Sequence, residues 1–234
     1  MPADKTFETA CGRRRFLRAA VYSAFVEAAA QAGVLVASAE ASNAPTDLSP
    51  DAALKILLDG NQRAASGKLT SMERDLAILR EHTVNKQEPF AAVLSCADSR
   101  VPVEMIFDQT IGDLFVTRVA GNIVTPEIIA SLEYGVAVLG VETLLVLGHS
   151  NCGAVKAAMK AEAVPGQIST LYPHLRQAVQ QAGGSLEKAI EANTKIQAEL
   201  LRTSSTVVRQ AVEGGKLKVE AGVYDLATGK VTLN

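Results

Sequence analysis

The sequence predicts an α/β fold in which a mainly parallel β-sheet is flanked by helices. Three apolar runs typical of buried strands alternate with segments of helical pattern, and they are Phe90–Ser95, Leu114–Val119 and Thr143–Leu147. Strand–helix–strand alternation implies βαβ units with right-handed crossovers, and therefore parallel strands. The third run is apolar along almost its whole length, as expected of a strand that is covered on both faces.

Composition is consistent with one globular domain of this kind. The chain has 234 residues, of which 48% are hydrophobic and 21% are charged, which is enough for one sizeable core. Its formal net charge is −2, and acidic and basic residues are interspersed. Because there is no basic block and no acidic tail, we expect neither a nucleic-acid partner nor a disordered binding arm.

The first forty residues differ from the rest of the chain. The segment CGRRRFLRAA, which contains Arg13 and Arg14, resembles a twin-arginine export signal, and a modestly apolar stretch, Ala19–Ala39, follows it. Glu27 within that stretch argues against a permanent membrane span. We therefore expect residues 1–41 to be a removable signal, residues 42–234 to form a single domain, and the mature protein to be periplasmic. The alternative is an amphipathic N-terminal helix on a cytoplasmic protein.

Two helices are expected before the first strand. The tripeptide Ser49–Asp51 supplies an N-cap and a first-turn proline for one of them, and Gly60-Asn61 is expected to end it. The second is expected at Met72–Val84. Each helix has an apolar side, which must pack either on the chain's own domain or on a second subunit.

Further helices are expected after each strand, and a β-hairpin is expected at the C-terminus. The helices are Val103–Phe107, Thr125–Leu139, Asn151–Ala161, Ile168–Gln181, Ser185–Glu199 and Ser204–Val212. The hairpin strands are Lys216–Tyr224 and Lys230–Leu233, with a Thr-Gly turn between them. We expect the first hairpin strand to add to an edge of the sheet.

Residues that can bind a metal follow two of the predicted strands. Cys96 comes directly after the first strand, His149 just after the third, and Cys152 at the start of the next helix. Ligands bind beyond the carboxyl ends of parallel strands, so these side chains are expected to meet. Two thiolates and an imidazole suit Zn²⁺, and three protein ligands leave a fourth position open, as in catalytic zinc sites. The alternative is two buried free cysteines and a core histidine. Cys11 would leave with the signal, so no further thiol would remain.

An acidic and a basic residue accompany the first cysteine. Asp98 and Arg100 lie two and four positions after Cys96. Arginine pairs with a carboxylate through two parallel N–H···O bonds and keeps it ionised. Held in this way, Asp98 can orient a zinc-bound water, whereas a released Asp98 could become a fourth ligand and close the site. The alternative is an ion pair that only stabilises the loop.

The two site motifs together resemble a known enzyme family. Cys96-Ala-Asp98-Ser-Arg100, followed by His149-Ser-Asn-Cys152-Gly153, is similar to the β-class carbonic anhydrases. The similarity runs from about Leu48 to the C-terminus and includes GDLFVTRVAGN, SLEYGVAVLGV and GVYDLATGKV. It implies that the two cysteines and the histidine bind zinc, that the aspartate and arginine form a catalytic dyad, and that the protein interconverts CO₂ with bicarbonate and a proton through zinc-bound hydroxide.

The resemblance also indicates residues that contact the substrate. Gln87 matches a glutamine that donates to bound substrate or anion, Phe115 matches one aromatic wall of the pocket, and Tyr134 matches another, contributed across a subunit boundary. The backbone N–H of Gly153, at its helix start, is a second donor for a developing bicarbonate oxygen. By pattern alone, Gln87 would be a solvated loop residue and both aromatic residues would belong to the core.

The resemblance and the ligand set also predict the oligomeric state and the pH dependence of activity. The family is dimer-based, with N-terminal helices that wrap the partner, so the resemblance implies a homodimer or homotetramer. Two thiolate ligands should make a bound water less acidic than three imidazoles would, so activity is expected to rise with pH.

Two alternatives remain, namely hydrolysis of a CO₂ analogue (carbonyl sulfide or carbon disulfide) and a non-catalytic zinc protein in which Asp98 closes the site. Arg100 argues against the second. His82 and His174 are candidates for proton transfer by residue type alone.

Overall fold

The computed structural model describes residues 48–71, 80, 81, 83–161 and 163–234. They belong to the unit Asn43–Asn234. The expected export signal and most of the second expected helix, Met72–Val84, lie outside the described residues. None of the described helices is long and apolar enough to cross a membrane.

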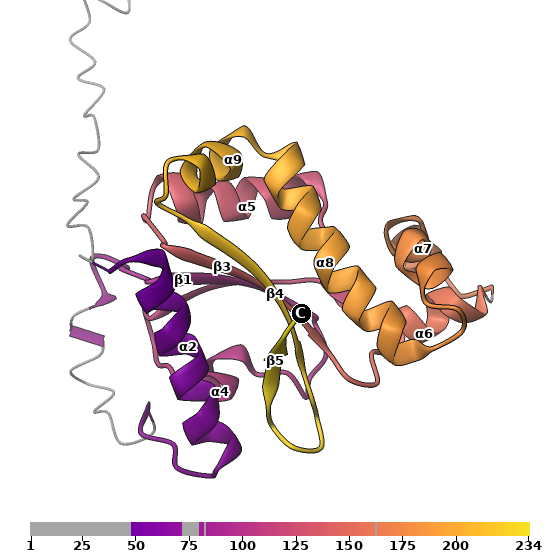
Figure 1. Ribbon diagram of the computed structural model, residues 1–234, viewed down its shortest axis with the longest axis horizontal. Helices are drawn as coiled ribbons and strands as arrows, with labels where there is room; N and C mark the ends of the chain where they lie inside the picture. Colours follow the sequence, from indigo (N-terminus) through magenta and orange to yellow (C-terminus); the bar gives the residue numbers. More distant parts are fainter. Residues whose placement is uncertain (1–47, 72–79, 82, 162) are drawn as a thin grey trace, which may run out of the picture. The chain divides into compact units, whose positions relative to one another are not determined.

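A five-stranded sheet forms the centre of the domain (Figure 1). In spatial order its strands are β2 (Leu114–Arg118), β1 (Ala91–Ser95), β3 (Thr143–His149), β4 (Lys218–Tyr224) and β5 (Val231–Leu233). The first four are parallel, and β5 runs antiparallel to β4. The predicted α/β fold with a mainly parallel sheet is therefore confirmed. The hairpin strand β4 does add to the sheet, beside β3, although β5 rather than β4 forms the edge.

Burial differs between the strands and follows their place in the sheet. Every residue of β1 and β3 is buried, as the apolar runs predict for strands covered on both faces. The edge strand β2 is only half-buried along most of its length. The backbone on its outer side has no strand partner among the described residues.

The first helix, α2 (Pro50–Ala65), begins where the sequence predicts. The side chain of Ser49 accepts a hydrogen bond from the Ala52 N–H at 3.2 Å, and Pro50 occupies the first turn. Its apolar side, which includes Ala53 and Leu57, packs against β1 and β3 of its own sheet. Of the two packing alternatives for this helix, the structure therefore shows packing on its own domain.

The expected end of this helix at Gly60-Asn61 is wrong, because α2 continues to Ala65. A Cβ atom on Gly60 would lie 1.9 Å from the carbonyl oxygen of Phe107, so glycine is required by close packing rather than by a turn. The Asn61 amide donates to the Ile106 and Gly229 carbonyls at 3.0 and 2.9 Å. Both residues make long-range contacts. In the local sequence alone, a glycine followed by an asparagine also looks like a helix end.

Helices cover both faces of the sheet. The short α4 (Val103–Ile106) lies with α2 on one face, while α5 (Pro126–Ala137), α8 (Leu186–Ser204) and α9 (Thr206–Glu213) lie on the other (Figure 1). The helix expected at Ser185–Glu199 runs five residues further, to Ser204. Only Ser205 separates it from α9, and its side chain caps α9 by accepting the Val208 N–H at 3.0 Å.

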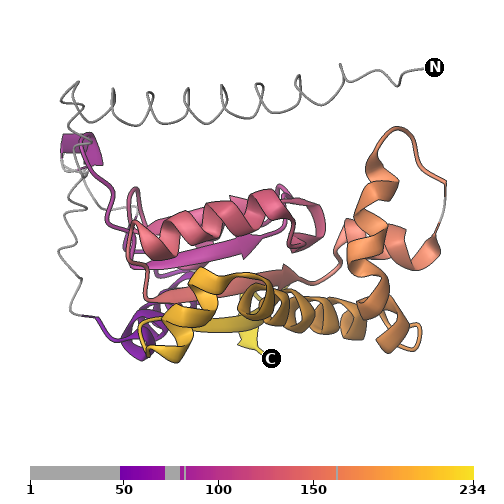
Figure 2. The same ribbon diagram turned by 90° about the horizontal axis from the view of Figure 1, so that it is seen from above.

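The remaining helices stand at the end of the sheet towards which the parallel strands point (Figure 2). These are α6 (Gly153–Lys160), which follows β3, and α7 (Tyr172–Gln181), which is preceded by the 3₁₀ turn η3 (Ile168–Leu171). A second 3₁₀ turn, η2 (Ala120–Asn122), follows β2. The carboxyl ends of β1, β2 and β3 thus lead into loops and helix starts in one region.

Candidate metal centre

The two cysteines and the histidine come together at the carboxyl edge of the sheet. Cys96 follows β1, His149 is the last residue of β3, and Cys152 is the N-cap of α6. Since β1 and β3 are parallel neighbours, with Ser95 opposite Leu147, their ends lie side by side. The three ligand atoms all lie within 4.8 Å of one another. Their residues are 4%, 0% and 1% exposed, so the cluster is buried.

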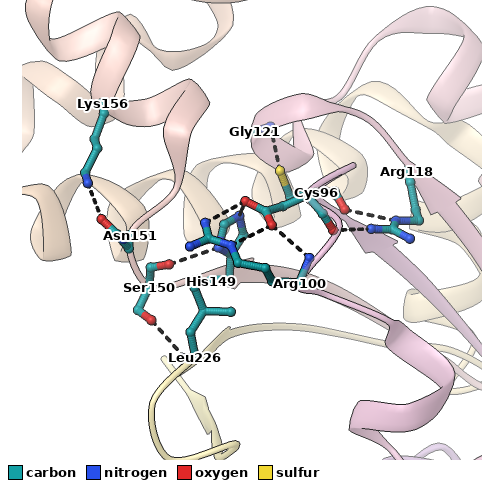
Figure 3. A network of polar contacts seen from close by, with 10 residues as sticks. Cys96, Arg100, Arg118, Gly121, His149, Ser150, Asn151, Lys156 and Leu226 are labelled. Carbon is teal, nitrogen blue, oxygen red and sulfur yellow. Dashed lines mark hydrogen bonds and ion pairs between the residues drawn. The ribbon is translucent and has the colours of Figure 1, made fainter.

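The imidazole of His149 is oriented in the way a metal ligand requires. Its Nδ1 lies 2.9 Å from the Ser150 carbonyl oxygen, which can only accept a hydrogen bond, so Nδ1 carries the proton (Figure 3). The other nitrogen, Nε2, is buried and has no hydrogen-bond partner among the described residues. A metal ion would satisfy this nitrogen, and a carbonyl behind Nδ1 is a usual support for a metal-bound histidine. The residues present therefore fit a zinc ion.

The two thiols are coupled to each other. The hydrogen bond with Cys152 is the main cause that lowers the pKa of Cys96, and the Gly121 N–H lowers it further, so that it falls from 9.0 to about 4 against the opposing effect of burial. The Gly121 N–H lies 3.3 Å from the Cys96 sulfur. The same shared proton, together with burial, raises the pKa of Cys152. The pair thus carries negative charge in a buried site, which favours a cation.

Asp98 is held by Arg100 beside this cluster. Arg100 donates from Nε and Nη2 to the two carboxylate oxygens at 2.9 and 2.8 Å, and its backbone N–H donates at 2.9 Å. These bonds hold the pKa of the Asp98 carboxyl well below its usual range. The nearer oxygen is 3.8 Å from His149 Nε2, and Asp98 is not one of the clustered ligand atoms. The structure therefore has the arrangement in which Asp98 is paired with Arg100.

Arg118 supports the loop that carries Cys96 and Asp98, and the sequence pattern did not single it out. It ends β2, opposite Ser95, and donates from Nε to the Cys96 carbonyl at 3.0 Å and from Nη2 to the Asp98 carbonyl at 2.6 Å (Figure 3). Its place at the carboxyl end of a predicted parallel strand was the signal that could have identified it.

The C-terminal hairpin supports the histidine side of the site. The Ser150 N–H donates to the Tyr224 carbonyl at 2.8 Å, and the Ser150 hydroxyl accepts the Leu226 N–H at 2.9 Å. The carbonyl of Ser150 is thereby held where it receives the His149 Nδ1–H (Figure 3). Pairing of β4 with β3 thus orients the imidazole.

Of the four expected substrate contacts, only Gly153 lies beside the cluster. Gly153 is the first residue of α6, directly after Cys152, and a Cβ there would have no atom within 4 Å. Phe115 pairs with Ala92, four residues before Cys96, which is about 13 Å along the strand.

The other two substrate contacts also lie away from the chain's own cysteines. Tyr134 stands on α5 with its ring centroid 6.2 Å from that of Phe115, and it is 46% exposed. Gln87 is exposed and precedes the amino end of β1. Within one chain, Phe115, Tyr134 and Gln87 therefore do not lie beside the cysteines. Of the histidines named for proton transfer, His174 is exposed on α7, and His82 lies outside the described residues.

Sequence comparisons identify the family of this chain. The model of the carbonic anhydrase family matches residues 91–231. A carbonic anhydrase of Mycolicibacterium smegmatis is 35% identical over 192 residues, which covers 79% of this chain and 93% of that protein. Carbonic anhydrase 2 of Mycobacterium tuberculosis is 32% identical over 192 residues and covers 79% and 92%.

Solved structures identify the class within this family. The β-carbonic anhydrase of Coccomyxa, in complex with acetazolamide, has a TM-score of 0.61 at 28% identity, covering 77% of this chain and 85% of that one. A tetrameric β-carbonic anhydrase of Sordaria macrospora has a TM-score of 0.61 at 25% identity, covering 77% and 95%. With a cysteine–histidine–cysteine cluster at the carboxyl edge of a parallel sheet, this chain belongs to the β-class of carbonic anhydrases, which are lyases that hydrate CO₂.

Proposed function

We propose that this protein uses zinc to hydrate CO₂ reversibly to bicarbonate and a proton. Cys96, His149 and Cys152 would hold the ion. The observation that supports this best is the buried Nε2 of His149, which has no hydrogen-bond partner among the described residues, on a side chain that clusters with both thiols within 4.8 Å. Zinc bound there would lower the pKa of a water molecule and supply a nucleophile near neutral pH.

Asp98 would orient that nucleophile. Its carboxylate stays ionised and fixed in direction because Arg100 donates to both of its oxygens. One oxygen lies 3.8 Å from the unpartnered histidine nitrogen, so it stands beside the position a metal would take. From there it can accept a hydrogen bond from the attacking oxygen and leave a lone pair directed at CO₂.

The start of α6 would bind the product. The first N–H groups of a helix have no acceptor within the helix, and Gly153 is the first residue after the ligand Cys152. A developing bicarbonate oxygen near the metal could accept from this N–H group. The space beside Gly153 is open, since a Cβ at this position would contact nothing within 4 Å.

Gln87, Phe115 and Tyr134 would line the pocket of a neighbouring subunit in a homodimer or homotetramer. All three lie away from their own cysteines, Tyr134 is 46% exposed, and the strand that carries Phe115 is an edge of the sheet. The Sordaria macrospora relative is tetrameric. A second copy that pairs along this edge would bring these side chains to the other chain's site.

Mixing two inactive variants tests this shared site. Asp98→Asn removes the dyad, and Gln87→Ala with Phe115→Ala removes the proposed wall. Each homodimer should be nearly inactive, but a mixed dimer would contain one site built entirely from unchanged residues. Random reassociation should restore about a quarter of wild-type activity. No recovery, with mixed dimers demonstrated by tagged subunits, would contradict the shared site.

The central test is stopped-flow CO₂ hydration with metal analysis on the same sample. We expect about one zinc per chain and a rate that rises with pH, and we expect Cys152→Ser to lose both zinc and activity. One zinc per chain without hydration at any pH would sink the proposal. Carbonyl sulfide and carbon disulfide would then be the next substrates to assay.

Export to the periplasm is a separate proposal that rests on Arg13 and Arg14. Fractionation of cells that produce the full-length chain should place the processed protein in the periplasm. Arg13→Lys with Arg14→Lys should retain it in the cytoplasm. An unprocessed wild-type chain found only in the cytoplasm would overturn this proposal.

A further inference from the structure

Two side-chain amides of α8 lie in the interior of the protein. Asn193 and Gln197 are each 1% exposed and stand one helical turn apart. Burial of an amide costs free energy unless its hydrogen bonds are replaced, so both side chains need partners. Two of those partners lie in the segment that follows β2, more than seventy residues away in the sequence, and a third is the His174 carbonyl, which accepts from Gln197 at 3.2 Å.

The two amides hold this segment at both ends. Asn193 donates from Nδ2 to the Gly121 carbonyl at 2.9 Å, and Gln197 accepts the Val124 N–H at 2.8 Å. Gln197 also donates from Nε2 to the Asn193 carbonyl oxygen at 3.0 Å, which fixes the orientation of both amides. The segment 121–124 therefore takes its place from α8.

The same segment reaches the metal centre. The Gly121 N–H donates to the Cys96 sulfur at 3.3 Å (Figure 3). Gly121 has a φ of +76°, a conformation that favours glycine. A Cβ on Gly121 would lie 3.3 Å from Ala154 and 3.4 Å from Leu175, so α6 and α7 leave this residue little room to move. Asn193 is the polar contact that decides how the residue is turned within that space.

We propose that Asn193, supported by Gln197, is a positioning residue for the metal centre. By holding the Gly121 carbonyl it keeps the Gly121 N–H directed at the Cys96 thiolate. Such a bond stabilises negative charge on sulfur and reduces the electron density that the thiolate donates to a metal. The inference rests on the zinc ligation proposed above, because it assigns these residues an effect on that same site.

The test uses the full-length chain loaded with Co²⁺, whose near-ultraviolet thiolate-to-metal charge-transfer band reports the two thiolate ligands, Cys96 and Cys152. Asn193→Asp keeps the size of the side chain but replaces its donor with an acceptor. We expect the band to move to longer wavelength, because the thiolate then donates more electron density to the metal. We also expect the Co²⁺ and Zn²⁺ dissociation constants to rise about tenfold, because the ligand is no longer held in a fixed position. Gln197→Glu should act in the same direction with a smaller effect, and it carries the test if Asn193→Asp does not fold.

Asn61→Asp is a matched control. Asn61 is also a buried helical asparagine, 4% exposed, and its amide likewise donates to backbone carbonyls, those of Ile106 and Gly229. It should lose stability like the Asn193 variant but keep the wild-type band and metal affinity. A wild-type band and affinity in Asn193→Asp and Gln197→Glu, or equal changes in Asn61→Asp, would overturn the inference. A wild-type chain that binds neither Co²⁺ nor Zn²⁺ would instead overturn the proposed zinc site, and this inference with it.

Discussion

Two aspartates in the described part of the chain, Asp98 and Asp108, pair with arginine, and they differ in what surrounds them. The side chain of Asp98 is 17% exposed, and its arginine, Arg100, is 50% exposed. The side chain of Asp108 is fully buried against Arg63, with Nε to carboxylate at 2.6 Å. Hydrogen bonds lower the pKa of both carboxyl groups, in Asp108 against the opposing effect of burial.

Their donors come from different distances along the chain. The described side-chain bonds of Asp98 all come from Arg100, two residues away. Asp108 instead accepts from Arg63, from the backbone and hydroxyl of Thr70 and from the Ser71 backbone, and so ties the loop after α2 to the end of α4. A lowered pKa therefore does not by itself mark a functional carboxylate. The unpartnered histidine nitrogen 3.8 Å from Asp98 is what distinguishes the two.

Among the changes that test this comparison, removal of the metal should have the largest effect on the CO₂ hydration rate. If Asp98 acts on a zinc-bound nucleophile, exhaustive dialysis against a chelator should lower the CO₂ hydration rate by a factor on the order of a thousand or more. Added Zn²⁺ should restore it. Circular dichroism should show that the overall secondary structure persists. Full activity in a sample without metal would remove the proposed role of Asp98.

Asp98→Asn should separate chemistry from stability. The amide keeps the size of the side chain but has no charge and is a weaker hydrogen-bond acceptor, so we expect about a 100-fold lower hydration rate with zinc content unchanged. The urea midpoint should change little, because a partly exposed ion pair contributes little to stability. A variant that hydrates CO₂ at the wild-type rate would reduce the pair to a loop contact.

Asp108→Asn should show the opposite result. It weakens several buried hydrogen bonds at once, so the free energy of unfolding should fall by about 2–3 kcal/mol in urea denaturation. The hydration rate per bound zinc should stay at the wild-type value. Asp59→Asn, which removes an exposed i,i+4 pair with Lys55, is the control and should change neither quantity. A loss of rate per zinc in Asp108→Asn would mean that this clamp also shapes the site.

The smallest expected effect is a change with acidic pH in the stability difference between wild type and Asp108→Asn. The pKa of Asp108 is depressed in the folded state, so its stabilising contribution is present above the ordinary value of 3.8 and is lost as the pH falls below it. The stability gap between wild type and Asp108→Asn should close by at most about 1.4 kcal/mol per pH unit. Urea denaturation at several pH values from about 5 down to 2.5 would measure this. A gap that stays constant over this range would show that folding does not depress the pKa of Asp108.

Much of the fold and the core of the site could be predicted because they depend on local patterns. Apolar runs followed by helical segments predict a parallel sheet, and the structure contains these elements in the expected order. Cys96 and His149 could be placed together because residues at the ends of parallel strands meet whatever lies between them in the sequence. Asp98 and Arg100 were visible for the same reason, since their contact spans only two residues.

The tertiary structure alone decided the contacts that connect distant segments. Gly60-Asn61 looked like a helix end because its true partners, Phe107 and Gly229, lie far along the chain. The position of Arg118 at a strand end marks it as a candidate, but no local pattern reveals that it reaches the Cys96 carbonyl or that Asn193 reaches the Gly121 carbonyl. A pattern of a few residues determines which element forms and which side of it is apolar. Which carbonyl a buried amide or guanidinium reaches depends on how the completed elements pack, and that is settled only when the whole chain has folded.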